Sequence, residues 1–401
     1  MRRFVSVALI VVGLGLMMIG LLAGLFYLGL PVVSTDANYD LLQINTVAMA
    51  VLTVGAAAGA MLAWVGWRRY TGASPRTVRM VNPLWFALLF FVALGLGQAV
   101  LGTRLAPWIF PPLHGLASIA PPLFFLTLAA WFIQSAGVFV LRRDLTLQVA
   151  GGAALATALA LVIEAVLIVL LALAAALVVA LTPGGAARLD ALATQLSQPD
   201  ILRDPVFLQS LLNSPLVLIG GGLVVAVVAP LIEEFAKSVG VLLLGVRRGA
   251  LRPAEAFLWG VAAGAGFAIT ETMFNTISAL PASWSGSLLL RAATAMLHCL
   301  CAGLMGLAWQ AWFSGERRWR LAAYYALAVA IHGLWNGVTA LTSVLQLQGA
   351  FSQNLLLLSG GVLLLFALGG LFIINSGLFV YFSRRVGQPP VTALPPLPAL
   401  D

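Results

Sequence analysis

The sequence predicts an all-α fold, a polytopic transmembrane helical bundle of about ten spans. Of the 401 residues, 62% are hydrophobic and only 8% are charged, whereas soluble domains carry about 25% charged residues. The mean hydropathy is +1.05. Apolar stretches of roughly 20 residues, long enough to cross a bilayer as a helix, recur along the chain. These observations exclude a soluble globular domain and make the lipid bilayer the expected surroundings.

Ten stretches are long enough to span the membrane. They cover approximately residues 4–30, 43–66, 83–102, 115–141, 147–182, 216–246, 256–280, 288–313, 321–345 and 355–382. The first stretch follows Arg2 and Arg3 as a signal sequence would. Its apolar run is about twice as long as a typical signal-peptide core, and no clear small-residue cleavage site follows. We therefore interpret it as a retained anchor.

The arginines predict the topology. The net charge is +8, but the basic residues form short clusters between apolar stretches instead of a continuous stripe, so no nucleic-acid partner is expected. Sixteen arginines fall at the termini or in every second loop: Arg2, Arg3, Arg68, Arg69, Arg76, Arg79, Arg142, Arg143, Arg247, Arg248, Arg252, Arg317, Arg318, Arg320, Arg384 and Arg385. Only four fall on the other side: Arg104, Arg188, Arg203 and Arg291. Because basic residues stay on the cytoplasmic side, both termini are expected there.

Composition divides the chain into five regions. We expect a five-span region at 1–182, an extracytoplasmic loop at 183–215, a four-span core at 216–345, a last span at 346–385 and a proline-rich cytoplasmic tail at 386–401. The four-span core holds nearly all ionisable side chains at membrane depth. Glu164 lies within a span of the first region, and no neighbouring motif assigns it a role.

The sixth span carries three charged residues in otherwise apolar sequence: Glu233, Glu234 and Lys237. Each costs about 2.5 to 3.5 kcal/mol to insert at the centre of a membrane helix, so their presence requires a functional or structural reason. Helical geometry lets Lys237 reach either carboxylate, while the two adjacent glutamates diverge by about 100°. One glutamate can therefore pair with the lysine while the other acts in chemistry. The competing interpretation is a structural ion pair between helices.

The next three spans add further polar groups. Glu271 lies deep in the seventh span, four residues after Phe267, and the preceding Gly260 and Gly264 predict close helix packing. The eighth span contributes His298. The ninth contributes His332 and Asn336, which lie four residues apart and so share one helical face. The remaining histidine, His114, is expected in an outer loop without a site role.

Four of these side chains are predicted to share one layer of the membrane. Counted from the cytoplasmic end of each span, Glu234, Glu271, His298 and His332 lie about 11 to 15 residues in, or roughly 17 to 23 Å at helical rise. Ionisable groups at this depth usually face a water-filled cavity or one another. The sequence therefore predicts that they converge on one water-holding site.

In these motifs the chain resembles the PrsW family of intramembrane proteases, within a wider group that includes CAAX-type prenyl endopeptidases. The matching pattern, in order, is Glu233, Glu234 and Lys237, then Phe267 and Glu271, then His298, then His332 and Asn336. It covers about residues 230–337. Thr272 departs from the commonest form of the second motif, which has asparagine there.

The resemblance implies an intramembrane endopeptidase in a bacterial plasma membrane that hydrolyses membrane-associated proteins, with anti-sigma factors as a known substrate class. Its catalytic base would be Glu233 or Glu234, and resemblance to the wider group favours Glu233. His332 and Asn336 would stabilise the oxyanion, with Lys237 and Phe267 in support. Residues 216–345 would then be the catalytic core.

A metal site is the second mechanism that the residues allow. Glu271, His298 and His332 have the two-histidine, one-carboxylate count of a catalytic zinc site. The resemblance carries a metalloprotease label, whereas the residues alone leave metal-dependent and metal-free catalysis open. The chain has neither an HExxH zinc motif nor a GxSxG serine elbow. The rival function is a nonenzymatic transporter or scaffold whose buried charges conduct protons or bind a partner.

The topology is testable by cysteine labelling in a background without the native cysteines. A cysteine at position 195 should react with a membrane-impermeant reagent in intact cells, and one at position 390 should react only after permeabilisation. Labelling of position 390 in intact cells would refute cytoplasmic termini.

Overall fold

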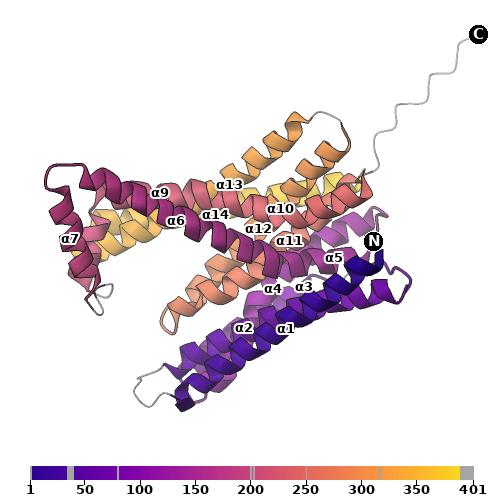
Figure 1. Ribbon diagram of the computed structural model, residues 1–401, viewed down its shortest axis with the longest axis horizontal. Helices are drawn as coiled ribbons and strands as arrows, with labels where there is room; N and C mark the ends of the chain where they lie inside the picture. The colour runs from indigo at the N-terminus through magenta and orange to yellow at the C-terminus, as the bar shows by residue number, and fades with distance from the viewer. Residues whose placement is uncertain are drawn as a thin grey trace, which may run out of the picture.

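The computed structural model confirms the all-α fold (Figure 1). It describes residues 2–33, 40–78, 81–198, 201, 204–249, 251–315 and 318–388. Within these residues, ten helices are long and apolar enough to cross a membrane, and the one β-type contact is an isolated bridge between Thr77 and Leu141. Each of the ten overlaps one predicted span.

Eight of the ten spans are built on one α-helix each. They are α1 Arg2–Val33, α2 Leu41–Tyr70, α3 Leu84–Leu101, α4 Ala106–Ser135, α11 Pro253–Asn275, α12 Trp284–Phe313, α13 Trp319–Ser352 and α14 Leu355–Gly387. The other two contain a π-helical turn. They are α5 Arg142–Ala150 with η1 Gly151–Ala156 and α6 Thr157–Ala180, and α9 Pro215–Leu223 with η3 Val224–Val228 and α10 Ala229–Arg248.

The fourth span begins earlier than predicted, and the loop assignment of His114 was wrong. Prolines made the start of α4 look like a loop, but Pro111 and Pro112 lie inside the helix, where neighbouring helices compensate for lost backbone hydrogen bonds. His114 is buried. Its Nε2 lies 2.9 Å from the carbonyl oxygen of Met273, and Trp284 Nε1 donates to its Nδ1 at 3.0 Å. The ring therefore links α4 to α11 and α12.

Two central helices, α11 and α12, form the core of the bundle, because most of their residues are buried. The predicted glycine pair explains how closely they pack. A Cβ atom on Gly260 would collide with the carbonyl of Ala302, and one on Gly264 would collide with the carbonyl of His298. Outer helices such as α1 and α6 instead expose leucine, isoleucine and valine over most of their length, as lipid-facing helices do.

A second close approach joins α13 to the start of α10. Pro230, in the first turn of α10, has no backbone N–H to donate, and the preceding residues form the π-helical turn η3. Gly333 of α13 packs directly against the carbonyl of Ala226 in this turn. This contact brings the neighbouring residue His332 to the level of the acids on α10.

The helix ends that carry arginine clusters lie on the same side of the bundle, as expected if an even number of spans separates one cluster from the next. Residues near the start of α1, the end of α2, the start of α5 and the end of α10 line one shared cavity, so these ends lie on one face. Figure 1 shows α7 Gly185–Leu196 at the far end of α6, away from the N-terminus. The predicted 183–215 loop thus contains helices, α7 and α8 Pro205–Leu212. The cytoplasmic assignment and the region boundaries stay predictions, and tail residues 389–401 lie outside the described residues.

Candidate active site

Four consecutive spans bring the predicted polar residues together. α10 supplies Glu233, Glu234 and Lys237, α11 supplies Phe267 and Glu271, α12 supplies His298, and α13 supplies His332 and Asn336. Contacts across the helices connect these side chains into one network, described below. It is mostly sealed, because Glu234, Lys237 and both histidines are at most 1% exposed.

Lys237 lies at the centre of the network. Its Nζ donates to Glu234 Oε1 at 2.8 Å and to His298 Nδ1 at 2.8 Å, and it lies 3.1 Å from Glu233 Oε2. The ammonium group also lies 4.3 Å from the centre of the Phe267 ring, a cation–π distance. The predicted supporting residues Lys237 and Phe267 therefore touch each other, and Lys237 also touches both acids.

The partners of His332 define its tautomer. Its Nδ1 lies 2.7 Å from Glu234 Oε1, and Asn336 Nδ2 donates to its Nε2 at 3.2 Å. Since a carboxylate only accepts and an amide NH₂ only donates, the proton is on Nδ1. The lone pair on Nε2 faces the Asn336 amide, and Glu233 Oε2 lies 3.8 Å from the same nitrogen. An oxyanion role for His332 would therefore require a second proton, on Nε2.

His298 is held in the corresponding way by another acid. Its Nδ1 accepts from Lys237, and its Nε2 lies 2.6 Å from Glu271 Oε2, which places the proton on Nε2. Glu271 Oε2 also lies 2.6 Å from Arg291 Nη2, and its Oε1 accepts from Asn275 at 3.2 Å. Glu271 is thus fixed on three sides.

The three acids differ in exposure, and this separates the two adjacent glutamates. The Glu234 side chain is 0% exposed and bonds to both His332 and Lys237. The Glu233 side chain is 10% exposed, and that of Glu271 is 22% exposed. Glu233 is therefore the glutamate of the pair that a reactant can reach.

One group of donor atoms in the described part of the chain is spaced to hold a metal ion. Glu233, His298 and His332 offer ligand atoms that all lie within 4.8 Å of one another. Two imidazoles and one carboxylate match the donor set of a catalytic zinc site. This group contains Glu233 where the sequence-based set has Glu271, which contacts His298 instead. The set with Glu271 stays a prediction.

Sequence reasoning gave two residues of this region no part in the site. Arg291 was counted as a topology residue at the end of a span, yet it pairs with Glu271. It lies seven residues, or two helical turns, before His298 on the same helix, and this spacing could have revealed it. Glu164 of α6 lies close enough for its charge to interact with Glu233, Glu271 and Lys237, and its buried Oε1 has no hydrogen-bond partner among the described residues.

A family model, PrsW family intramembrane metalloprotease, matches residues 142–368, more than half of the chain. The chain belongs to the PrsW family. The match extends from α5 into α14, well beyond the motif region at 230–337, and so includes the fifth span. Comparisons with curated proteins and with solved structures gave no match. Membership in the PrsW family implies intramembrane proteolysis, a metal ion and membrane-protein substrates within a lipid bilayer.

The Arg291 contact predicts a loss of activity on substitution. Arg291→Gln leaves Glu271 without its cation and loosens the orientation of His298. Because residues that orient ligands typically contribute 10- to 100-fold, cleavage of a membrane-anchored substrate should slow by about that factor. Arg291→Lys should recover part of the rate, and the exposed Arg104→Gln serves as the control. An unchanged rate in Arg291→Gln at equal abundance would contradict this role.

Proposed function

We propose that this PrsW family protein is an intramembrane endopeptidase of a bacterial plasma membrane that hydrolyses membrane-anchored proteins at a site built on Glu233, His298 and His332. One observation carries the proposal. Each histidine is held by its own carboxylate, Glu271 for His298 and Glu234 for His332. Both histidines and Glu233 also offer ligand atoms that all lie within 4.8 Å of one another.

The donor set fits zinc. Glu233, His298 and His332 would hold the ion, and Glu234 and Glu271 would fix the histidine tautomers, as carboxylates behind zinc-bound histidines commonly do. Such an ion would polarise the scissile carbonyl and make a bound water ionise near neutral pH. The carboxylate behind each histidine also raises its basicity and limits its rotation.

Lys237 has a defined part in this arrangement. Its ammonium group donates to His298 Nδ1, so a metal ion could bind this nitrogen only by displacing the lysine. Release of His298 would leave Lys237 paired with Glu233 and Glu234, which lie 3.1 and 2.8 Å away. The lysine would therefore stay paired with both adjacent carboxylates at membrane depth after a metal ion has taken its place on His298.

Asn336 is our candidate for oxyanion stabilisation. Its amide now donates to His332 Nε2 at 3.2 Å and to the carbonyl of Val225 at 3.4 Å. When His332 Nε2 is used for another bond, one N–H of this amide becomes available. A preorganised amide donor of this kind stabilises the charge that develops on the carbonyl oxygen during hydrolysis.

The substrate class rests on the family. Membership implies membrane-protein substrates, and we propose membrane-anchored regulatory proteins of the anti-sigma-factor type among them. A transporter or scaffold would use the same buried charges without breaking a bond. Lys237 contacts two acids and His298, and Glu271 and His332 extend this network. Such a network is more than an ion pair between helices requires, and the family is proteolytic.

The activity test uses purified protein in lipid and a membrane-anchored substrate, found by comparing membrane proteomes with and without active enzyme. Glu233→Gln keeps the shape of the side chain but removes its charge and basicity. Cleavage should fall by at least about 100-fold, while abundance and thermal stability change little. Asp190→Asn, at an exposed position of α7, is the control with the same acid-to-amide change. Full cleavage by Glu233→Gln would exclude the proposed site.

The zinc content of purified variants distinguishes Glu233 from Glu271 as the carboxylate ligand of the metal ion. If Glu233 is a ligand, Glu233→Gln should lose most of its bound zinc, whereas Glu271→Gln should keep more of it. Elemental analysis of the purified variants measures this directly. Zinc retained in Glu233→Gln but lost in Glu271→Gln would make Glu233 the base, as the resemblance favours, and Glu271 the third ligand, as in the sequence-based metal set.

A further inference from the structure

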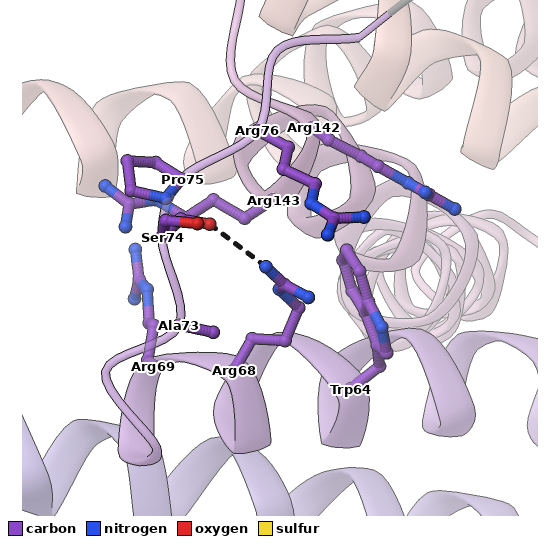
Figure 2. Close-up of a pocket in the computed structure, with 9 residues that line it drawn as sticks. All are labelled: Trp64, Arg68, Arg69, Ala73, Ser74, Pro75, Arg76, Arg142 and Arg143. Atoms are coloured by element: carbon purple, nitrogen blue, oxygen red, sulfur yellow. Dashed lines mark hydrogen bonds between the residues drawn. The ribbon is translucent and has the colours of Figure 1, made fainter.

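Seven arginines from three separate segments line two adjoining cavities at one end of the bundle. They are Arg68, Arg69, Arg76, Arg142, Arg143, Arg247 and Arg248. Both cavities share Arg68, Arg69 and Arg143 in their walls. Figure 2 shows the smaller cavity, with five of the arginines gathered around the loop of Ser74 and Pro75.

Backbone contacts hold this cluster together, so it is not an accident of flexible side chains. The loop after α2 pairs with the segment before α5: Val78 N donates to the carbonyl of Val140 at 3.0 Å, and Arg142 N donates to that of Arg76 at 2.9 Å. This pairing fixes Arg76 beside Arg142. The last turn of α10 completes the wall of the larger cavity.

The cluster contains more positive charge than its acids neutralise. Asp144 is fully buried and lies 4.0 Å from Arg69 and 3.5 Å from Arg143, and it also pairs with Arg248. Glu255 pairs with Arg248 and with Arg252 outside the cavity. Among the described residues, no carboxylate lies within 4.0 Å of the other four arginines, which are Arg68, Arg76, Arg142 and Arg247. These four guanidinium groups thus have no ion pair with a described carboxylate, although Arg68 also donates to the carbonyl oxygen of Ser74 at 3.0 Å.

The walls of the cavities indicate which kind of anion fits. The larger cavity has a volume of about 490 Å³, and apolar side chains of Val5 and Leu244 line it beside the arginines. Trp64 lies near the C-terminal end of α2. The centre of its ring lies 5.7 Å from Cζ of Arg68 and 5.1 Å from Cζ of Arg142. Tryptophan and arginine at the end of a span are typical of the headgroup layer, and arginine binds phosphate oxygens in a bidentate manner.

We propose that the larger of the two arginine cavities binds the phosphate headgroup of an anionic membrane phospholipid. The apolar wall and the position at the ends of α2 and α10 favour a lipid over a free phosphate ion. The arginine-rich face is also the one predicted to be cytoplasmic, and anionic lipids give that leaflet its negative surface potential. This site is separate from the proposed protease site.

The test measures binding of phosphatidylglycerol to the purified full-length protein by native mass spectrometry and by thermal stability, with phosphatidylcholine as the neutral comparison. The double variant Arg68→Gln with Arg247→Gln removes the two arginines of the larger cavity that have no ion pair with a described carboxylate. Since each arginine near a membrane surface contributes about 1 kcal/mol, phosphatidylglycerol should bind about 30-fold more weakly. The matched control, Arg104→Gln with Arg188→Gln, removes two exposed arginines elsewhere and should bind as the wild type does.

Three results would overturn the proposal. One is wild-type affinity for phosphatidylglycerol in the double variant. Another is equal stabilisation of the wild type by phosphatidylcholine. The third is equal stabilisation by inorganic phosphate at matched concentration, which would assign the cavity to a free anion. If the double variant fails to fold, the wild type alone decides: raising the salt concentration should weaken binding of phosphatidylglycerol and leave that of phosphatidylcholine unchanged.

Discussion

The ammonium group of Lys237 is the interaction on which the construction of the site depends. Glu233 and Glu234 are adjacent in a membrane span, and each charge at the centre of a span costs about 2.5 to 3.5 kcal/mol. Lys237 contacts both carboxylates and also His298, so it links α10 to α12. Without this cation the two acids would repel each other in surroundings that screen charge poorly.

Close backbone packing puts the histidines within reach of these acids. Gly264 lies against the carbonyl of His298 itself, and Gly333 follows His332 and lies against the carbonyl of Ala226. In lipid, helices associate through such close packing and through polar contacts, because apolar surface gains little by leaving the bilayer. The same glycine contacts therefore hold the bundle together and position the site.

Charge in this protein is separated along α10. The acids lie near its start, at membrane depth, and their partners are buried lysine and histidine. Arg247 and Arg248 lie in its last turn, where the negative end of the helix dipole favours cations and where the headgroup layer begins. The proposed protease site and the proposed lipid site thus share one rigid helix while facing different surroundings.

The sequence by itself determined the ten spans, the family and the order of the polar motifs. These could be predicted because an ionisable side chain is costly in lipid and stands out in apolar sequence. The tertiary structure decided which partner each residue has. It showed that Glu233 is partly exposed whereas Glu234 is fully buried, and it paired Arg291 with Glu271. It also placed His114 in the core instead of a loop, and grouped Glu233 with the two histidines. Sequence spacing fixes the face of a single helix, but the rotation and approach of neighbouring helices determine which side chains meet across them.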